Sequence, residues 1–449
     1  MYTFKKENTW RDDQSDFILR RKRRILRTKG ARAIFLLLTA LFLTLAVGPV
    51  YQSIKDFIVG LSTSSTIPLA QKAPAQWNMV QTRSLVKDLK FLNSTESLFI
   101  VDTPGDSYRI QTSLDTELMK YLNSVMGKLK IRNRGKPRQL AMVLMDANTG
   151  QIKAMAGYDL ENPNSNPCTR PDFPAASIFK IVTATAAIDD LGYNPKTPLY
   201  FNGNKYTLYK RQLKKRRNKY TTRTTLERAF AQSVNPVFGK LGQNHLGRER
   251  LDRYAAAFGF NQMIPGDLGT NAGHFATNES KYHLAELGSG FNQDTVISPL
   301  FAATMVTAVL NGGRLLLPSM VDSIETAKDE KVYNRKTASY RTPMKSETAK
   351  TMQTLMRKTI TLGTASKSFR RVRKHKILSQ FTMGGKTGSL YNREHTIKYD
   401  WFAGFAKEKQ GTTAVSIAVL VGHGKYIGSR ATTLAQQALK QYLNTLTKK

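Results

Sequence analysis

One apolar run near the N-terminus constrains the topology of this chain more than any other feature. The 22 residues from Ala33 to Ile54 include no charged side chain, and residues 34–47 are mainly Leu, Phe and Ala. A helix of this length spans the roughly 30 Å hydrocarbon layer of a bilayer. The sequence therefore predicts a transmembrane anchor, which we place at residues 33–52.

Basic residues before this run predict its orientation. Eight Lys and Arg residues lie between Arg20 and Arg32, and positive segments stay on the cytoplasmic side of a membrane. We therefore expect residues 1–32 to form a basic cytoplasmic tail and the rest of the chain to be exported. A cleaved signal peptide is the alternative, but the Ala-x-Ala triplet at 73–75 lies far beyond the apolar run.

Net charge narrows the classes of partner. The chain has 69 Lys and Arg residues against 32 Asp and Glu, a formal charge of +37. Of this, +7 belongs to the tail 1–32, which has eleven basic and four acidic residues, so the remainder keeps +30. Such an excess favours nucleic acid, acidic polymers or anionic lipid as partners. The expected export disfavours nucleic acid, and we expect no nucleic-acid partner.

The few cysteine and histidine residues give no basis for a metal site. The six histidines form no His-Glu-x-x-His pattern, and one cysteine cannot build a zinc site. We expect no metal and no cofactor. Cys168 cannot form an intramolecular disulfide, and we interpret it as a small, partly buried structural thiol.

Hydrophobic periodicity predicts the fold class of the part that follows the anchor. Residues 53–107 resemble a stalk or linker, and we expect the main domain to span 108–449. Apolar runs predict strands at 140–145, 151–156, 383–390, 399–406 and 414–422, and helical spacing predicts helices at 177–190, 224–232, 299–310, 346–362 and 432–445. Strands at both ends with helices between them predict an α/β fold of the α+β type, with an antiparallel sheet covered by helices and a helical subdomain.

Local patterns also predict two helix caps. Ser113 precedes Leu114, the first of several apolar residues at helical spacing, and is the expected N-cap of that helix. Asn235 precedes Pro236, and we expect it to cap a helix whose first residue is proline.

A serine and a lysine three residues apart form the first candidate catalytic pair. Ser177 and Lys180 lie at the predicted start of a helix, where residues at this spacing share one face. A serine needs a neighbouring base to act as a nucleophile, and a lysine can serve if burial or another cation favours its neutral form. Backbone N–H groups at a helix start can also stabilise an oxyanion. Taken alone, the pair also fits an ordinary amphipathic helix.

Two further motifs follow in order. Ser233-Val-Asn235 lies 56 residues after Ser177, at a break between two predicted helices, and alone would indicate capping. The segment Lys386-Thr387-Gly388-Ser389 comes 153 residues later, after Gly384-Gly385 and at a predicted strand. We expect those glycines to let a ligand backbone approach the strand edge closely. The three motifs in this order make coincidence improbable.

With these motifs the sequence resembles the transpeptidase domain of penicillin-binding proteins, in the serine β-lactamase-like superfamily. The likeness covers roughly residues 108–449. It extends to six other family-like segments, at 110–115, 145–155, 225–233, 287–290, 298–300 and 400–404. The resemblance implies a β-lactamase/transpeptidase-like fold and a monofunctional enzyme on a bacterial inner (plasma) membrane. Ala175-Ala176 stands where the family commonly has Pro-Gly.

The resemblance also implies a role for each motif residue. Ser177 would attack the penultimate D-Ala of a peptidoglycan stem peptide, releasing D-Ala and leaving an acyl-enzyme, and Lys180 would take its proton. Ser233 would relay a proton, and Asn235 would hold Lys180 and a substrate amide. Lys386 would be the fifth catalytic residue and add positive potential, while Thr387, Gly388 and Ser389 would bind the substrate, Thr387 and Ser389 at its carboxylate. The backbone N–H groups of Ser177 and Ser389 would form an oxyanion hole.

The same resemblance implies partners and leaves alternatives open. A neighbouring strand's amine would accept the acyl group, and β-lactams would trap Ser177 covalently. Other wall-synthesis proteins are expected partners, besides the membrane itself. A D,D-carboxypeptidase, a membrane-tethered β-lactamase, a penicillin-binding sensor without turnover and a non-catalytic scaffold are the competing interpretations.

Two basic clusters are not explained by these motifs. One lies within 205–228 and the other within 367–376, leading to the third motif. Both fit solvated hairpin tips. Alternatively, they contact an anionic envelope polymer or lipid headgroups.

Overall fold

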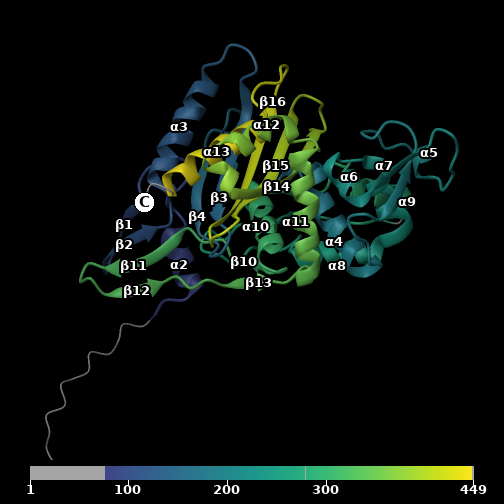
Figure 1. The fold of residues 1–449 in the computed structure, drawn as a ribbon. Coiled ribbons are helices and arrows are strands. Elements are labelled where there is room, and N and C mark those ends of the chain that lie inside the picture. Colours follow the sequence, from purple (N-terminus) through teal and green to yellow (C-terminus); the bar gives the residue numbers. More distant parts are fainter. Residues whose placement is uncertain (1–75, 279, 447–449) are drawn as a thin grey trace, which may run out of the picture. The chain divides into compact units, whose positions relative to one another are not determined.

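A five-stranded antiparallel sheet lies at the centre of the computed structural model, which describes residues 76–278 and 280–446 (Figure 1). Its strand order is β14-β15-β16-β3-β4. The strands are β3 Pro137–Asp146, β4 Ile152–Asp159, β14 Phe381–Tyr391, β15 Lys398–Glu408 and β16 Ala414–His423. The pairing of β16 with β3, which sets Ile417 opposite Leu144, therefore joins the two ends of the domain.

Two pairs of helices pack on this sheet. One pair is α10 Pro299–Leu310 with α11 Ser346–Thr361, and the other is α3 Thr116–Lys130 with α13 Ala431–Leu446. Strand β16 contacts both α10 and α13, and all ten of its residues are buried. A strand covered on both faces is expected to be almost continuously apolar rather than alternating, and β16 is apolar except for Ser416 and His423.

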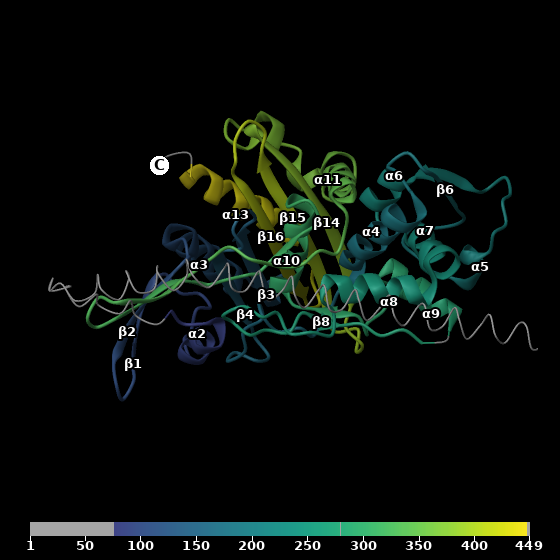
Figure 2. The ribbon, with the colours of Figure 1, turned by 90° about the horizontal axis from the view of Figure 1, so that it is seen from below.

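A helical subdomain lies beside strand β14 (Figures 1 and 2). Its main helices are α4 Lys180–Leu191, α6 Leu226–Ala231, α7 Asn235–Lys240, α8 Gly247–Phe258 and α9 Lys281–Ser289. The subdomain also includes the hairpin of β6 Pro198–Phe201 and β7 Thr222–Thr225, which flanks the short helix α5 Lys210–Leu213. A π-helical turn, Leu241–Leu246, joins α7 to α8.

A second antiparallel sheet is built from segments far apart in the sequence. It has the order β1-β2-β11-β12, with β1 Leu98–Asp102, β2 Ser107–Thr112, β11 Val321–Thr326 and β12 Lys331–Asn334. Helix α2, Met79–Val86, is closed at its start by a capping box in which Asn78 accepts from the Gln81 N–H. Part of the range predicted as stalk thus contains a helix and strand β1.

The described structure also contains a short helix, α12 Ser366–Phe369, and several short strands. The strands are β5 Phe173–Pro174, β8 Gly273–His274, β9 Val296–Ile297, β10 Leu315–Leu316 and β13 Ser339–Arg341. The predicted tail 1–32 and anchor 33–52 lie outside the described residues. Within residues 76–278 and 280–446, no helix is both long and apolar enough to cross a bilayer.

The predicted mixed fold, an antiparallel sheet covered by helices, is confirmed, whereas both predicted caps are wrong. Asp115 caps α3 by accepting from the Leu118 N–H, while Ser113 instead donates its hydroxyl to the Ile152 carbonyl. Val234 is the N-cap of α7, and Asn235 lies inside the helix. In each case a tertiary partner takes the side chain that local pattern had assigned to capping.

Candidate active site

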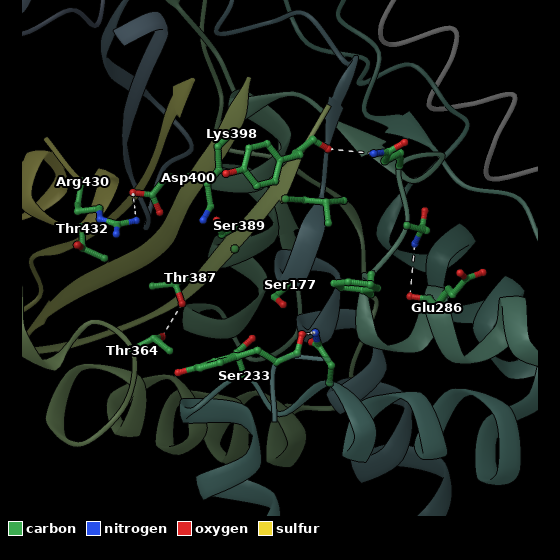
Figure 3. A pocket seen from close by; sticks show the side chains of 18 of the residues that line it. Ser177, Ser233, Glu286, Thr364, Thr387, Ser389, Lys398, Asp400, Arg430 and Thr432 are labelled. Carbon is green, nitrogen blue, oxygen red and sulfur yellow. Dashed lines mark hydrogen bonds and ion pairs between the residues drawn. The ribbon is translucent and has the colours of Figure 1, made fainter. Parts of the chain in front are cut away.

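The three motifs converge on one cleft between the helical subdomain and the edge strand β14 (Figure 3). The cleft has a volume of about 1040 Å³. Six of the eight predicted site residues line it: Ser177, Ser233, Asn235, Thr387, Gly388 and Ser389. The other two, Lys180 and Lys386, are fully buried and reach motif hydroxyls with their amino groups.

Ser177 lies on a 3-10 turn, Ala176–Phe179, rather than in the first turn of an α-helix. The α-helix begins at Lys180, which brings the lysine back beneath the serine. Lys180 Nζ lies 2.7 Å from Ser177 Oγ, 2.8 Å from Asn235 Oδ1 and 2.5 Å from the Ser289 carbonyl oxygen. The predicted Ser-Lys pair is therefore in hydrogen-bonding contact.

These contacts suit a neutral Lys180. Burial lowers the pKa of Lys180 well below its usual value, and the charge of nearby Lys386 lowers it further. A neutral amine has two N–H groups and one lone pair, while the oxygens of Asn235 and Ser289 can only accept. If those two oxygens take the N–H groups, the lone pair is left for the Ser177 hydroxyl. The geometry thus provides the base that Ser177 needs.

The second motif is held on a strained turn between α6 and α7. Ser233 has a φ of +56°, which is rare for a residue with a side chain. Its hydroxyl accepts from Lys386 Nζ at 2.9 Å. Asn235 donates from Nδ2 to the Tyr206 carbonyl at 2.9 Å, which turns Oδ1 toward Lys180. The amide is therefore oriented by the backbone of a different segment.

The third motif lies on β14, an edge strand of the central sheet. Lys386 points into the protein, where burial lowers its pKa to about 7, while Thr387, Gly388 and Ser389 line the cleft. An exposed strand edge presents unpaired backbone groups to a ligand. This edge can therefore bind an extended peptide beside Ser177.

The glycines before the third motif have a role different from the one predicted. A Cβ on Gly384 would lie 2.6 Å from the Phe405 ring, and one on Gly385 would lie 2.4 Å from the Phe402 ring. These glycines make room for buried aromatic rings, not for a ligand. Gly388 is the glycine next to the reacting groups, since its Cβ would lie 3.3 Å from the Ser177 backbone nitrogen.

The backbone before Ser177 is also strained and tightly packed. Ala176 has a φ of +47° in the left-handed region. A Cβ on Gly290 would lie 2.0 Å from the Ala176 carbonyl oxygen, so only glycine fits there. Trp401 Nε1 donates to the Pro174 carbonyl at 2.9 Å. Several segments together hold the nucleophile in place.

Sequence reasoning missed most of the cleft wall. Figure 3 shows residues of this wall, among them Glu286, Thr364, Lys398, Arg430 and Thr432. They come from separate loops and elements, and no motif in the sequence marks them.

The wall carries charges of both signs. Its cations include Lys367, Lys398 and Arg430, and its acids include Glu286 and Asp400. Asp400 Oδ2 accepts from the Ala431 N–H at 3.1 Å, and burial raises the pKa of Glu286. The cations near Thr387 and Ser389 favour an anionic group at that end of the cleft.

The residues described around the cleft include no metal site and no reactive thiol. Within the described ranges, no three His, Cys, Asp or Glu side chains are grouped closely enough to hold a metal ion. Cys168 is fully buried, and burial raises the pKa of its thiol to about 12. A thiol with such a pKa is inert near neutral pH.

Comparisons with known proteins agree with this arrangement. Residues 140–440 match the family model described as "Penicillin binding protein transpeptidase domain". The sequence matches none of the curated proteins with which it was compared.

Solved structures share the fold at low identity. PBPA from Mycobacterium tuberculosis is 19% identical over 74% of this chain and 81% of its own, with a TM-score of 0.60. The D,D-transpeptidase domain of a peptidoglycan glycosyltransferase from Eggerthella lenta is 21% identical over 85% of this chain and 89% of its own, with a TM-score of 0.61. With its family model matched over most of the domain and its three motifs gathered in one cleft, this chain belongs to the penicillin-binding protein transpeptidase family.

Proposed function

We propose that this protein is a peptidoglycan D,D-transpeptidase that cross-links stem peptides through an acyl-enzyme on Ser177. The observation that carries the proposal is the contact of 2.7 Å between Ser177 Oγ and the buried Lys180 amine. The family membership supports serine acyl transfer, and the extended strand edge of β14 fits a peptide substrate.

The first half-reaction follows from these contacts. Ser177 Oγ bonds to the carbonyl carbon of the penultimate D-Ala while Lys180 takes the hydroxyl proton. The bond from that carbon to the terminal D-Ala nitrogen then breaks. The proton held by Lys180 passes through the hydroxyl of Ser233, which lies between the cleft and Lys386, to the leaving amine, so Lys180 is neutral again. Free D-Ala leaves, and the donor peptide remains esterified to Ser177.

The second half-reaction reverses these proton transfers. An amine of a neighbouring stem peptide bonds to the ester carbon, its proton moves to Lys180 by way of Ser233, and the Ser177 oxygen leaves with a proton from Lys180. Thr387 and Ser389 hold the terminal carboxylate of the donor in the first step, beside the charge of Lys386. A β-lactam presents a similar carboxylate and a strained amide, and we propose that it acylates Ser177. Penicillin-binding protein A from M. tuberculosis forms a ceftriaxone acyl-enzyme complex.

Labelling with a fluorescent penicillin tests the acyl-enzyme directly. We expect a stable covalent band on the full chain that is absent from Ser177→Ala and strongly reduced in Lys180→Ala. An intact Ser177→Ala protein that still labels would refute the assignment of the nucleophile. A pentapeptide ester or amide donor with an added D-amino acid acceptor then distinguishes cross-linking from hydrolysis by the ratio of the two products.

A hydrolase, either a carboxypeptidase or a β-lactamase, is the second candidate, and Glu286 is the observation that favours it. Glu286 lines the cleft, burial raises its pKa, and its Oε2 lies 3.6 Å from Nδ1 of His283. A carboxylate with a raised pKa can activate water. If Glu286→Gln lengthens the lifetime of the penicillin acyl-enzyme by orders of magnitude, the hydrolase is favoured. An unchanged lifetime favours the transpeptidase.

We also propose that the catalytic domain lies outside the cytoplasm, tethered by residues 33–52. The uncharged run and the basic residues before it support this topology. Protease added to intact spheroplasts is expected to digest the domain, whereas the same protein without residues 1–52 is expected to stay protected in the cytoplasm. Protection of the full chain would contradict the proposed orientation.

A further inference from the structure

A second cavity, separate from the active-site cleft, lies at the end of the helical subdomain that carries α5. Three segments form it: the start of α5 and the residues after it, the π-helical turn, and the start of α9. Its volume is about 580 Å³. Four lysines line it, together with neutral polar side chains: Lys210, Lys214, Lys215, Lys281, Gln243, Asn244 and Ser280. Figures 1 and 2 show α5 at the end of this subdomain away from the central sheet.

Lys210, Lys214 and Lys215 lie in the loop between β6 and β7, which is held in a defined conformation, and Lys281 lies at the start of α9. The buried Gln212 accepts from the Tyr209 N–H at 2.9 Å and donates to the Asn202 carbonyl at 2.8 Å and the Asn204 carbonyl at 3.0 Å. Leu208 and Leu213 pack against Ala285 of α9. The lysines are therefore placed by a built scaffold and not by a free hairpin tip.

The described part of the chain gives these four lysines no acidic partner. Among the residues that the structure describes, none of the four lysines forms an ion pair, and none of the residues lining the cavity is acidic. Elsewhere the chain does pair its cations: Arg170, for example, contacts both Asp159 and Asp172. Like charges held together without partners cost free energy unless a ligand neutralises them.

Neighbouring groups respond to this positive charge. Burial lowers the pKa of His245, and the charges of Lys215 and Lys240 lower it further. Burial likewise lowers the pKa of Lys240, with a further contribution from Arg217. The field of the basic loop thus extends into the protein beneath it.

The loop also exposes aromatic rings among its cations. Tyr206, Tyr209 and Tyr220 are 52%, 52% and 73% exposed. Each lies under a cation: Lys205 is 5.1 Å from the Tyr206 ring, Arg211 is 5.3 Å from the Tyr209 ring, and Lys219 is 5.2 Å from the Tyr220 ring. Exposed rings between cations suit a polymer with both apolar faces and anionic groups.

We propose that this cavity and its loop are a docking site for a phosphate-bearing polyanionic chain. A concave site whose four lysines form no ion pair with any residue that the structure describes suits discrete phosphate groups along a polymer better than the flat surface of a bilayer. One segment contributes to both sites, because Tyr206 lines the cleft and Lys210 lines the cavity. A polymer bound in the cavity would thus contact the segment whose Tyr206 carbonyl holds Asn235.

Binding of a short inorganic polyphosphate tests the proposal without reference to catalysis. The full chain, kept in neutral detergent, is compared with a variant that carries Lys210→Gln, Lys214→Gln, Lys215→Gln and Lys281→Gln. The matched control carries Arg370→Gln, Arg371→Gln, Lys374→Gln and Lys376→Gln, which removes the same charge from the other basic cluster. Labelling with fluorescent penicillin shows that both variants are folded, since none of these residues belongs to the catalytic machinery.

We expect the cavity variant to lose at least about tenfold in polyphosphate affinity at fixed salt, and the control less than about threefold, because only the cavity lysines contact the bound polyanion directly. Equal losses in the two variants would show attraction by net charge alone and would overturn the proposal. A parallel measurement uses phosphatidylglycerol vesicles. A cavity-specific loss seen with vesicles but not with polyphosphate would assign the site to lipid, and the polymer proposal would fail.

Discussion

At the scale of single residues, Lys386 is a buried cation whose environment opposes its charge. Burial lowers its pKa to about 7 from the ordinary value of 10.5. Below pH 7 it is charged in both folded and unfolded states, and folding then bears the full cost of burying that charge. As the pH rises from 7 toward 10.5, Lys386 loses its proton only in the folded state. The contribution of Lys386 to the free energy of unfolding therefore becomes more favourable to the folded state.

This environment predicts that Lys386→Met stabilises the fold. Replacing a buried ion pair by apolar side chains of similar volume is often neutral or stabilising by about 1–4 kcal/mol, and we expect a gain within this range for Lys386→Met. We expect the Tm gain to be larger at pH 6 than at pH 10, as measured by thermal unfolding at both values. The Lys386→Arg protein, which keeps the charge at both pH values, is the control. A gain for Lys386→Met that increased with pH would contradict the assignment.

Ala176 gives a second prediction at this scale. Its φ of +47° is unfavourable for a residue with a Cβ, whereas glycine adopts it freely. Ala176→Gly removes a buried methyl group, which destabilises the fold, but also relieves the backbone strain, which stabilises it. Because the two effects oppose each other, we expect the free energy of unfolding to change by less than about 1 kcal/mol.

The matched control for this prediction is Ala184→Gly. Ala184 is fully buried within α4, where no strain is relieved, and the change should cost about 2 kcal/mol. Denaturant unfolding measures both values. Equal losses at the two positions would show that the strain at residue 176 does not affect stability.

At the scale of elements, the core under β14 depends on two facing glycines. Gly385 pairs with Gly404 across β14 and β15, and a Cβ on either would lie within 2.6 Å of the Phe402 ring. We expect Gly385→Ala to cost about 1–3 kcal/mol by overpacking. Adding Phe402→Leu should recover part of this loss, so a double-mutant cycle should show favourable coupling. Additive losses would mean that the ring is not the obstacle.

The elements also show what the sequence could predict and what it could not. Helix α10 has the predicted bounds 299–310, because Ser298, Pro299 and the turn after Leu310 are local cues. The sheet of β1, β2, β11 and β12 was not predicted, since β2 pairs with a strand about two hundred residues away and no local cue specifies that partner.

The candidate site also has one part that the sequence could predict and one part that it could not. Its eight motif residues could be predicted because three short motifs in a fixed order resemble those of a known family, although the first two motifs alone also fit an ordinary helix start and a helix cap. The wall residues, such as Glu286 and Thr364, could not, because separate loops bring them to the cleft only after folding. The predicted role of Gly384-Gly385 was wrong for a similar reason: the rings that fill the space belong to β15, a different strand.

At the scale of the whole molecule, the formal charge of +37 opposes compaction through self-repulsion. Salt screens this repulsion, because the Debye length falls from about 30 Å at 0.01 M to about 8 Å at 0.15 M. Salt also weakens attractive surface pairs such as Lys120 with Glu117 and Lys350 with Glu347, but exposed pairs contribute only about 0–1 kcal/mol each. The two effects change stability in opposite directions, so the sign of the salt dependence shows which one is larger.

We expect the repulsion to be larger, because cations outnumber acids by 69 to 32. The Tm of the full chain should then rise by a few degrees between about 0.01 M and about 0.15 M sodium chloride.

Removing four cations from either basic cluster should raise the Tm at low salt and reduce the salt effect, and the two variants should behave alike in chloride. Phosphate can then replace chloride at equal ionic strength. Only proteins that keep the four lysines of the cavity should become more stable in phosphate, since a bound ligand stabilises the folded state. A Tm that falls with added chloride would show instead that attractive surface pairs outweigh the net repulsion in this chain.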